Sequence, residues 1–188
     1  MVLLHTAESN VQTFSKLLAD LAPDIPVKHI LRDDLLAAAF AADGLTDKIR
    51  NETRDALIAA TDEGAGLVVC TCSTIGPGAD DAHSQNHAAG KVDVLRIDRP
   101  MAQEAVSSAE NITVAATFST TLKPTLDLVE DAARVAGREV NIVPCLIEGA
   151  KELFQAGDTA GYQAAIANGL QQAAQSTDLI VLAQASMA

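Results

Sequence analysis

The stretch that decides the fold is residues 66–78, which read GLVVCTCSTIGPG. An apolar, β-branched run ends abruptly in small hydroxyl residues and glycine, and a helix-compatible segment follows. This order predicts a strand, a tight turn and a helix start, with the thiol of Cys72 at the turn. Because helix N-termini attract anions and favour thiolates, Cys72 is a candidate reactive thiol beside an anion-binding loop. The competing interpretation is a small residue that fills a tight strand–helix junction.

Short apolar runs alternate with amphipathic runs along the rest of the chain. Predicted strands cover residues 2–5, 27–31, 67–71, 92–97, 112–117, 140–145 and 179–184. Predicted helices cover residues 11–21, 35–42, 46–61, 79–88, 101–109, 122–136, 150–156 and 160–174, and Tyr162 belongs to the apolar stripe of the last one. Alternating strands and helices predict parallel βαβ units, and continuous apolar runs are typical of parallel strands that are buried on both faces.

The fold class that follows is α/β, with two similar lobes of mainly parallel sheet flanked by helices. Pro100 can open a helix at its first turn, so we place the lobe boundary there, between residues 1–98 and 99–188. A weak internal echo supports two lobes: VVCTCST in the first half is similar to VAATFSTT in the second. Both stretches are predicted strands that run into loops rich in serine and threonine.

Ligands of open α/β sheets bind at the carboxyl ends of the strands. Candidate strand ends are His5–Thr6, Cys70–Thr74, Thr117–Thr121 and Gln184–Ser186, which carry small hydroxyls, amides and thiols. Lysine and arginine are missing from these segments, and Lys123 lies just beyond the third. The pattern predicts a pocket in which backbone N–H groups and hydroxyls surround a small carboxylate.

Composition limits the class of partner. A net charge of −12 argues against nucleic-acid binding, since phosphates need a basic surface. No apolar stretch is long enough to span a bilayer, and the first residues lack the basic start of a signal peptide. Three cysteines do not make a disulfide framework, and free thiols fit a cytoplasmic protein. We expect a homo-oligomer, with a homodimer as the simplest form.

With the strand ends assembled, the chain resembles the aspartate/glutamate/hydantoin racemase superfamily over nearly its whole length. The stretches that carry the resemblance are LLHT, LVVCTCSTIG, ITVAATFSTT, QAGD and DLIVLAQASM. Their order and spacing together are specific, and the Cys-Ser-Thr element matches the signature of the family's first lobe.

The resemblance implies two lobes that face each other across an active-site cleft, and an enzyme that needs no cofactor. In such enzymes a thiolate from one lobe removes the proton beside a carboxylate, and a thiol from the other lobe protonates the opposite face. Cys72 matches the first-lobe cysteine. The implied substrate-binding residues are Ser73 and Thr74 beside it and Thr117, Ser119 and Thr120 in the second lobe, and Thr6 and Gln184 join them from the other strand ends.

The sequence departs from the family pattern at several positions. Gln184 stands where the second catalytic cysteine is expected, and glutamine does not transfer protons. His5 stands where amino-acid racemases of this type carry aspartate. The chain ends at Ala188, where family members usually continue through a segment that returns to the first lobe, so we expect either a missing segment or a trimmed lobe.

His5 is the second catalytic candidate, because it ends the first strand and can orient Cys72 or contact substrate; a structural histidine is the alternative. Cys70 is predicted to be a core residue. His83 and His87 are spaced for one helix face, but no third ligand is evident, so we expect no metal site.

These observations predict a racemase or isomerase that acts on a small amino acid or related carboxylate through Cys72. A single thiol also suits a decarboxylase or an isomerase of an unsaturated diacid on the same scaffold. A carboxylate-binding protein without turnover is the alternative from another class.

Overall fold

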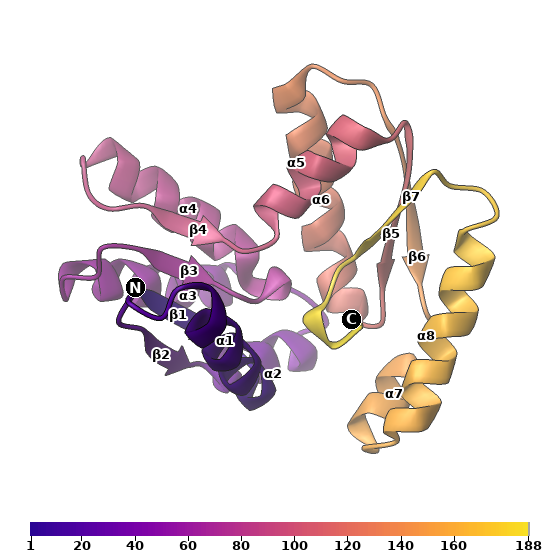
Figure 1. Ribbon diagram of the computed structural model, residues 1–188, viewed down its shortest axis with the longest axis horizontal. Helices are drawn as coiled ribbons and strands as arrows, with labels where there is room; N and C mark the ends of the chain where they lie inside the picture. The colour runs from indigo at the N-terminus through magenta and orange to yellow at the C-terminus, as the bar shows by residue number, and fades with distance from the viewer. Residues whose placement is uncertain (188) are drawn as a thin grey trace. The chain divides into compact units, whose positions relative to one another are not determined.

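The computed structural model describes residues 1–187, and the chain divides into two compact units, Met1–Ile97 and Asp98–Ala188. Each unit is a parallel β-sheet with helices packed along it (Figure 1). The predicted α/β class with two parallel sheets is therefore confirmed. No helix formed by residues 1–187 combines the length and the apolar character needed to cross a membrane.

The first unit holds a four-stranded sheet in the order β2-β1-β3-β4. Its elements are β1 (Val2–His5), α1 (Glu8–Leu21), β2 (Lys28–Leu31), α2 (Asp33–Ala41), α3 (Asp47–Asp62), β3 (Val68–Cys70), the 3-10 turn η1 (Ser73–Ile75), α4 (Gly76–Ala88) and β4 (Val94–Arg96). Leu4, Leu57 and Val68 are fully buried in its core. The interior strands are short and apolar because both of their faces are covered.

The second unit holds a three-stranded sheet in the order β6-β5-β7. Its elements are α5 (Arg99–Ser108), β5 (Asn111–Ala116), α6 (Ser119–Ala136), β6 (Asn141–Leu146), α7 (Ala150–Gln155), α8 (Thr159–Ala173), β7 (Leu179–Leu182) and the 3-10 turn η2 (Ala185–Met187). Ile112, Val114 and Val129 fill the core between β5 and its helices.

The two sheets share one topology over three strands. In chain order β5, β6 and β7 take the places of β1, β2 and β3. In each sheet an equivalent backbone hydrogen bond joins the residue after the third strand to the first strand. Thr71 N–H donates to Leu4 O at 3.0 Å, and Ala183 N–H donates to Ala115 O at 2.9 Å. The sequence similarity between VVCTCST and VAATFSTT therefore pairs strands that are not equivalent, because it matches β3 with β5. Both are interior strands that run into a hydroxyl-rich turn, and this common environment explains the similarity.

Several helices begin earlier than the sequence predicts, and two of these starts hold predicted site residues. The structure begins α6 at Ser119 rather than residue 122, and η1 and α4 follow Cys72 directly instead of beginning at residue 79. Serine, threonine and glycine in these segments favoured a loop in the prediction, but such residues also suit first helical turns. Thr74 and Thr120 therefore lie in first turns.

Close packing of α3 on α4 depends on Gly78. A Cβ atom at this position would lie 2.7 Å from the backbone oxygen of Arg50 and 2.7 Å from Cβ of Thr53. We expect Gly78→Ala to lower the free energy of unfolding by about 2 kcal/mol, because the clash exceeds the gain in helix propensity. Urea denaturation measures this. Gly66→Ala is the matched control, since nothing lies within 4 Å of its Cβ position; equal stability of both variants would contradict the prediction.

Candidate functional site

The thiol of Cys72 lies just past the carboxyl end of β3. The strand ends at Cys70, whose side chain is buried in the core as predicted, whereas Cys72 is partly exposed. Cys72 has extended backbone angles and immediately precedes η1, so the chain turns from strand to helix at this residue. Among its predicted neighbours, Thr74 is buried and Ser73 is partly exposed. The structure thus places a partly exposed cysteine, which also packs against the core of the first unit, at a strand end and a helix start.

His5 is completely buried at the end of β1, and protein partners engage both of its ring nitrogens. Nδ1 lies 2.8 Å from Thr71 Oγ1, and Nε2 lies 2.8 Å from Nδ1 of His29. His29 in turn lies 3.1 Å from Ser15 Oγ through Nε2. This geometry corresponds to the structural alternative for His5: the ring holds Thr71, the residue before Cys72. The catalytic role predicted for His5 would then be indirect: His5 would help to position Cys72 by holding Thr71.

The side chains of Ser15, His29, His5 and Thr71 form one continuous hydrogen-bonded chain. Both hydroxyls also have a backbone acceptor, since Thr71 Oγ1 donates to Leu4 O at 3.0 Å and Ser15 Oγ donates to Val11 O at 2.6 Å. With both imidazoles neutral, His5 donates through Nδ1 to Thr71 and accepts at Nε2 from His29 Nδ1. The single hydroxyl proton of Ser15 can then go to Val11 O or to Nε2 of His29, but not to both. Burial, and secondly the charge of His29, lower the pKa of His5 to about 4.

This low pKa makes folding sensitive to acid. Between pH 6.5 and 4 the unfolded chain protonates His5 and the folded chain does not, so stability present above pH 6.5 is lost as the pH falls. We expect the loss to reach about 3 kcal/mol. Urea unfolding at a series of pH values measures it. His5→Gln should flatten the dependence, while the exposed control His83→Gln should leave it intact; the same slope in both variants would contradict the assignment.

In the second unit, Gln184 follows β7 and is held by Thr117, which follows β5. Gln184 Oε1 accepts the backbone N–H of Thr117 at 2.7 Å and the Thr117 hydroxyl at 3.0 Å. Thr117 Oγ1 lies 3.0 Å from the Tyr162 hydroxyl, which lies 2.9 Å from Ser186 Oγ. Tyr162, predicted only as part of an apolar stripe, is thus a polar member of this strand end.

The shared register makes Gln184 the counterpart of Cys72. Thr71 and Ala183 donate the two equivalent backbone hydrogen bonds, and Cys72 and Gln184 are the next residues along the chain. Each of these two residues leads into a 3-10 turn. By the same count Thr117 is the counterpart of Thr6, and both are buried. The second unit therefore carries an amide at the position where the first carries a thiol.

Two donors at this end of the second unit lack protein partners. Within residues 1–187, neither Thr120 Oγ1 nor Gln184 Nε2 has a hydrogen-bond partner, and both atoms are buried. A buried polar group without a partner costs about 1–3 kcal/mol, so the pair suits a ligand that brings acceptor atoms. Thr120 lies in the first turn of α6, where the helix dipole also favours negative charge. Ser119 beside it is exposed.

Two of the cations near the strand ends form ion pairs with carboxylates. Lys123 forms an exposed pair with Asp127 at 2.8 Å, and this partner raises the pKa of the lysine. Sequence reasoning missed Arg96, which ends β4, is almost completely buried and pairs with Asp80 at 2.8 Å. Its guanidinium occupies the space that a side chain at Gly76 would need, which fixes the helix start after Cys72. An arginine inside an apolar strand was the available signal.

Histidines at the other end of α4 do not form a metal centre in this structure. His83 and His87 stack with ring centroids 5.9 Å apart, and His83 faces Asp93 at 3.9 Å. A search of residues 1–187 finds no cluster of three His, Cys, Asp or Glu side chains that could hold a metal ion.

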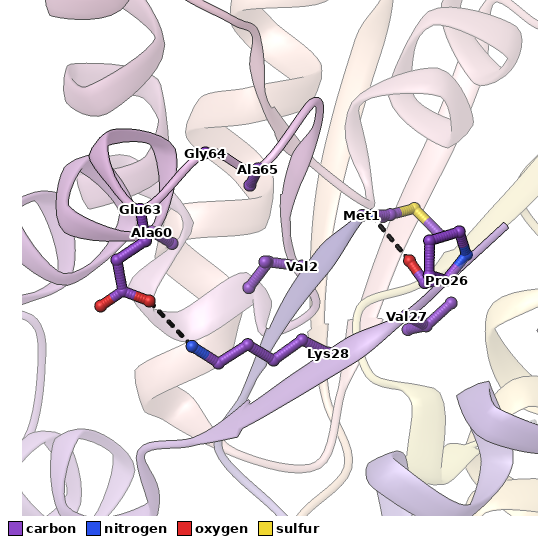
Figure 2. A pocket seen from close by; sticks show the side chains of 9 residues that line it. All are labelled: Met1, Val2, Pro26, Val27, Lys28, Ala60, Glu63, Gly64 and Ala65. Carbon is purple, nitrogen blue, oxygen red and sulfur yellow. Dashed lines mark hydrogen bonds and ion pairs between the residues drawn. The ribbon is translucent and has the colours of Figure 1, made fainter.

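The first unit also has a cavity of about 270 Å³, whose lining residues are labelled in Figure 2. Its lining includes Val2 and Lys28, the first residues of β1 and β2, so it lies at the amino ends of the strands. Lys28 pairs there with Glu63 at 2.8 Å, and the Met1 amine donates to Pro26 O at 2.9 Å. Cys72 follows the opposite end of β3, so this cavity is separate from the candidate site.

Comparison with solved structures identifies the fold. The aspartate racemase of Picrophilus torridus matches with a TM-score of 0.65 and 15% identity over 100% of this chain and 81% of that chain. A glutamate racemase from Bacillus anthracis matches with a TM-score of 0.64 and 13% identity over 97% and 67%. A maleate isomerase from Pseudomonas putida S16 has a TM-score of 0.49 and 14% identity over 100% and 78%.

No protein-family model and no curated protein sequence matches this chain. At identities of 13% and 15% the structural likeness concerns the fold, and at that level it confirms the resemblance carried by the strand-end motifs. The chain has the fold of the aspartate/glutamate racemase superfamily.

Proposed function

We propose that this protein is a cofactor-independent enzyme of the racemase or isomerase type, acting on a small amino acid or related carboxylate through Cys72. The observation that carries the proposal is the position of Cys72, a partly exposed cysteine between an interior strand and a helix start. Cys70, only two residues earlier, is sealed in the core. The fold shared with aspartate and glutamate racemases supports the same class of chemistry.

In this mechanism the Cys72 thiolate removes the proton from the carbon beside the substrate carboxylate. The electron pair passes into the carboxylate, which becomes an enediolate, and the thiol later returns a proton to carbon. A chain with a net charge of −12 must compensate this anion locally. In the first unit, the helix start after Cys72 and the hydroxyl of Thr74 are the groups proposed to do so.

Gln184 favours a second candidate, a decarboxylase on the same scaffold. Two-base racemisation needs a titratable group on each face of the planar intermediate, and an amide supplies none. Gln184 occupies the position in the second unit that corresponds to Cys72 in the first. Loss of carbon dioxide followed by protonation needs one acid only, and Cys72 supplies it.

Substitution of Cys72 tests the proposal. We expect Cys72→Ser to lower turnover at least 1,000-fold on any substrate found among aspartate, glutamate and methylmalonate, since a serine hydroxyl does not ionise at neutral pH. α-Proton exchange in deuterated water and release of carbon dioxide are the readouts. The matched control Cys70→Ala should lose about 2 kcal/mol of stability and keep its turnover.

Iodoacetamide should modify Cys72 in the wild-type protein faster than Cys70, as mass spectrometry of the peptides will show. If Cys72→Ala keeps full turnover, the proposed mechanism is wrong. An inert Cys72 in a protein that binds carboxylates would instead indicate a binding protein.

Substitution of Gln184 tests the one-sided chemistry. In deuterated water the wild-type protein should exchange the α-proton of one enantiomer with retention and racemise it slowly, because only one face receives a proton. Gln184→Cys should raise racemisation relative to exchange, as chiral chromatography and NMR will measure. Rapid racemisation of both enantiomers by the wild-type protein would show that another residue supplies the second proton.

A further inference from the structure

We propose that Gln184 is a fixed hydrogen-bond donor that selects a carboxylate of the ligand, and that Tyr162 and Ser186 are the residues that hold it in this orientation. The inference rests on the proposed function for the class of ligand, a small carboxylate. It concerns the second unit alone and assigns binding, rather than proton transfer, to the position that corresponds to Cys72.

The orientation of the Gln184 amide follows from its partner. A backbone N–H can only donate, so the amide atom 2.7 Å from Thr117 N must be the carbonyl oxygen. The Thr117 hydroxyl at 3.0 Å donates to the same oxygen. Two donors therefore occupy Oε1, and the NH₂ group must point to the other side.

A chain of hydroxyls sustains this arrangement. Thr117 gives its single hydroxyl proton to Gln184, so its oxygen must accept from Tyr162 at 3.0 Å. Tyr162 then accepts from Ser186 at 2.9 Å. Every proton of the chain points toward Gln184, and Tyr162 is only 4% exposed. Without the tyrosine hydroxyl, Thr117 is free to turn away from the amide.

The unpartnered groups of this arrangement are suited to an acceptor. Gln184 Nε2 is buried and has no partner within residues 1–187, and the same holds for the hydroxyl of Thr120, a residue only 4% exposed. A carboxylate oxygen would satisfy either group, and its charge strengthens the hydrogen bond. An ammonium group would find no acceptor on the NH₂ group of Gln184, whereas the hydroxyl of Thr120 can donate or accept. The NH₂ group of Gln184 is therefore the group that favours a carboxylate over an amine.

The sharpest test is Gln184→Glu, because the two side chains have the same shape. A glutamate keeps an oxygen for both Thr117 donors and replaces the NH₂ group with a second oxygen. We expect the dissociation constant for malonate, measured by titration calorimetry at pH 7.5, to rise roughly 30-fold or more. Gln172→Glu on the exposed side of α8 makes the same change in net charge and should shift it less than about 2-fold.

Tyr162→Phe tests the positioning role through its dependence on Gln184. With glutamine present, loss of the hydroxyl should weaken malonate binding roughly 5- to 10-fold. In a Gln184→Met background, where no amide remains to be oriented, the same substitution should change the affinity less than about 2-fold. Equal losses in both backgrounds would show a merely structural tyrosine and would overturn the assigned role.

The outcomes separate this inference from the proposed function. Malonate affinity unchanged in Gln184→Glu overturns the donor assignment, even if Cys72→Ser abolishes turnover. Turnover retained in Cys72→Ser overturns the enzyme mechanism, even if Gln184→Glu loses malonate. A wild-type protein that binds none of malonate, succinate and acetate at millimolar concentration overturns the ligand site itself.

Discussion

One backbone hydrogen bond in each unit determines where the chemistry can be. Thr71 N–H to Leu4 O, and Ala183 N–H to Ala115 O, lock the third strand of each unit against the first at the end of the sheet. The next residue, Cys72 or Gln184, therefore lies outside the sheet at a fixed place, just before a 3-10 turn. Cys72 and Gln184 owe their positions to this constraint. Parallel strands supply it without any contribution from side chains, so the residue at that place is free to vary.

The units use this common frame in different ways. In the first, the positions beside the closing bond carry His5 and Thr71, which extend a polar chain through His29 to Ser15. In the second, the polar chain starts from Thr117 and runs through Tyr162 to Ser186. One chain contains titratable rings, and the other contains hydroxyls and an amide. The proposed division of labour, proton transfer by a thiol and recognition by an amide, follows from this difference.

Sequence reasoning predicts the fold well, because local patterns determine the strands and helices. Apolar runs mark the buried strands, and the order of elements predicts two parallel sheets. The site is harder to predict, since its decisive contacts join residues far apart in the chain. Thr117 and Gln184 are 67 residues apart, and Tyr162 and Thr117 are 45 apart. An apolar stripe predicts that Tyr162 is buried and says nothing of its hydroxyl. The placement of Arg96 required knowing that β4 ends beside the Cys72 turn.

The hydroxyls and the amide around Gln184 have a consequence for how the proposed carboxylate site behaves in acid and base. Thr117, Thr120 and Gln184 carry no proton that is gained or lost over the physiological range. Recognition by this strand end is therefore independent of acidity, in contrast to the histidine chain of the first unit. A dependence of the proposed binding on pH must therefore come from the ligand or from the stability of the protein. As long as the ligand stays ionised, these groups would bind a carboxylate in the same way at a pH where acid already weakens the first unit.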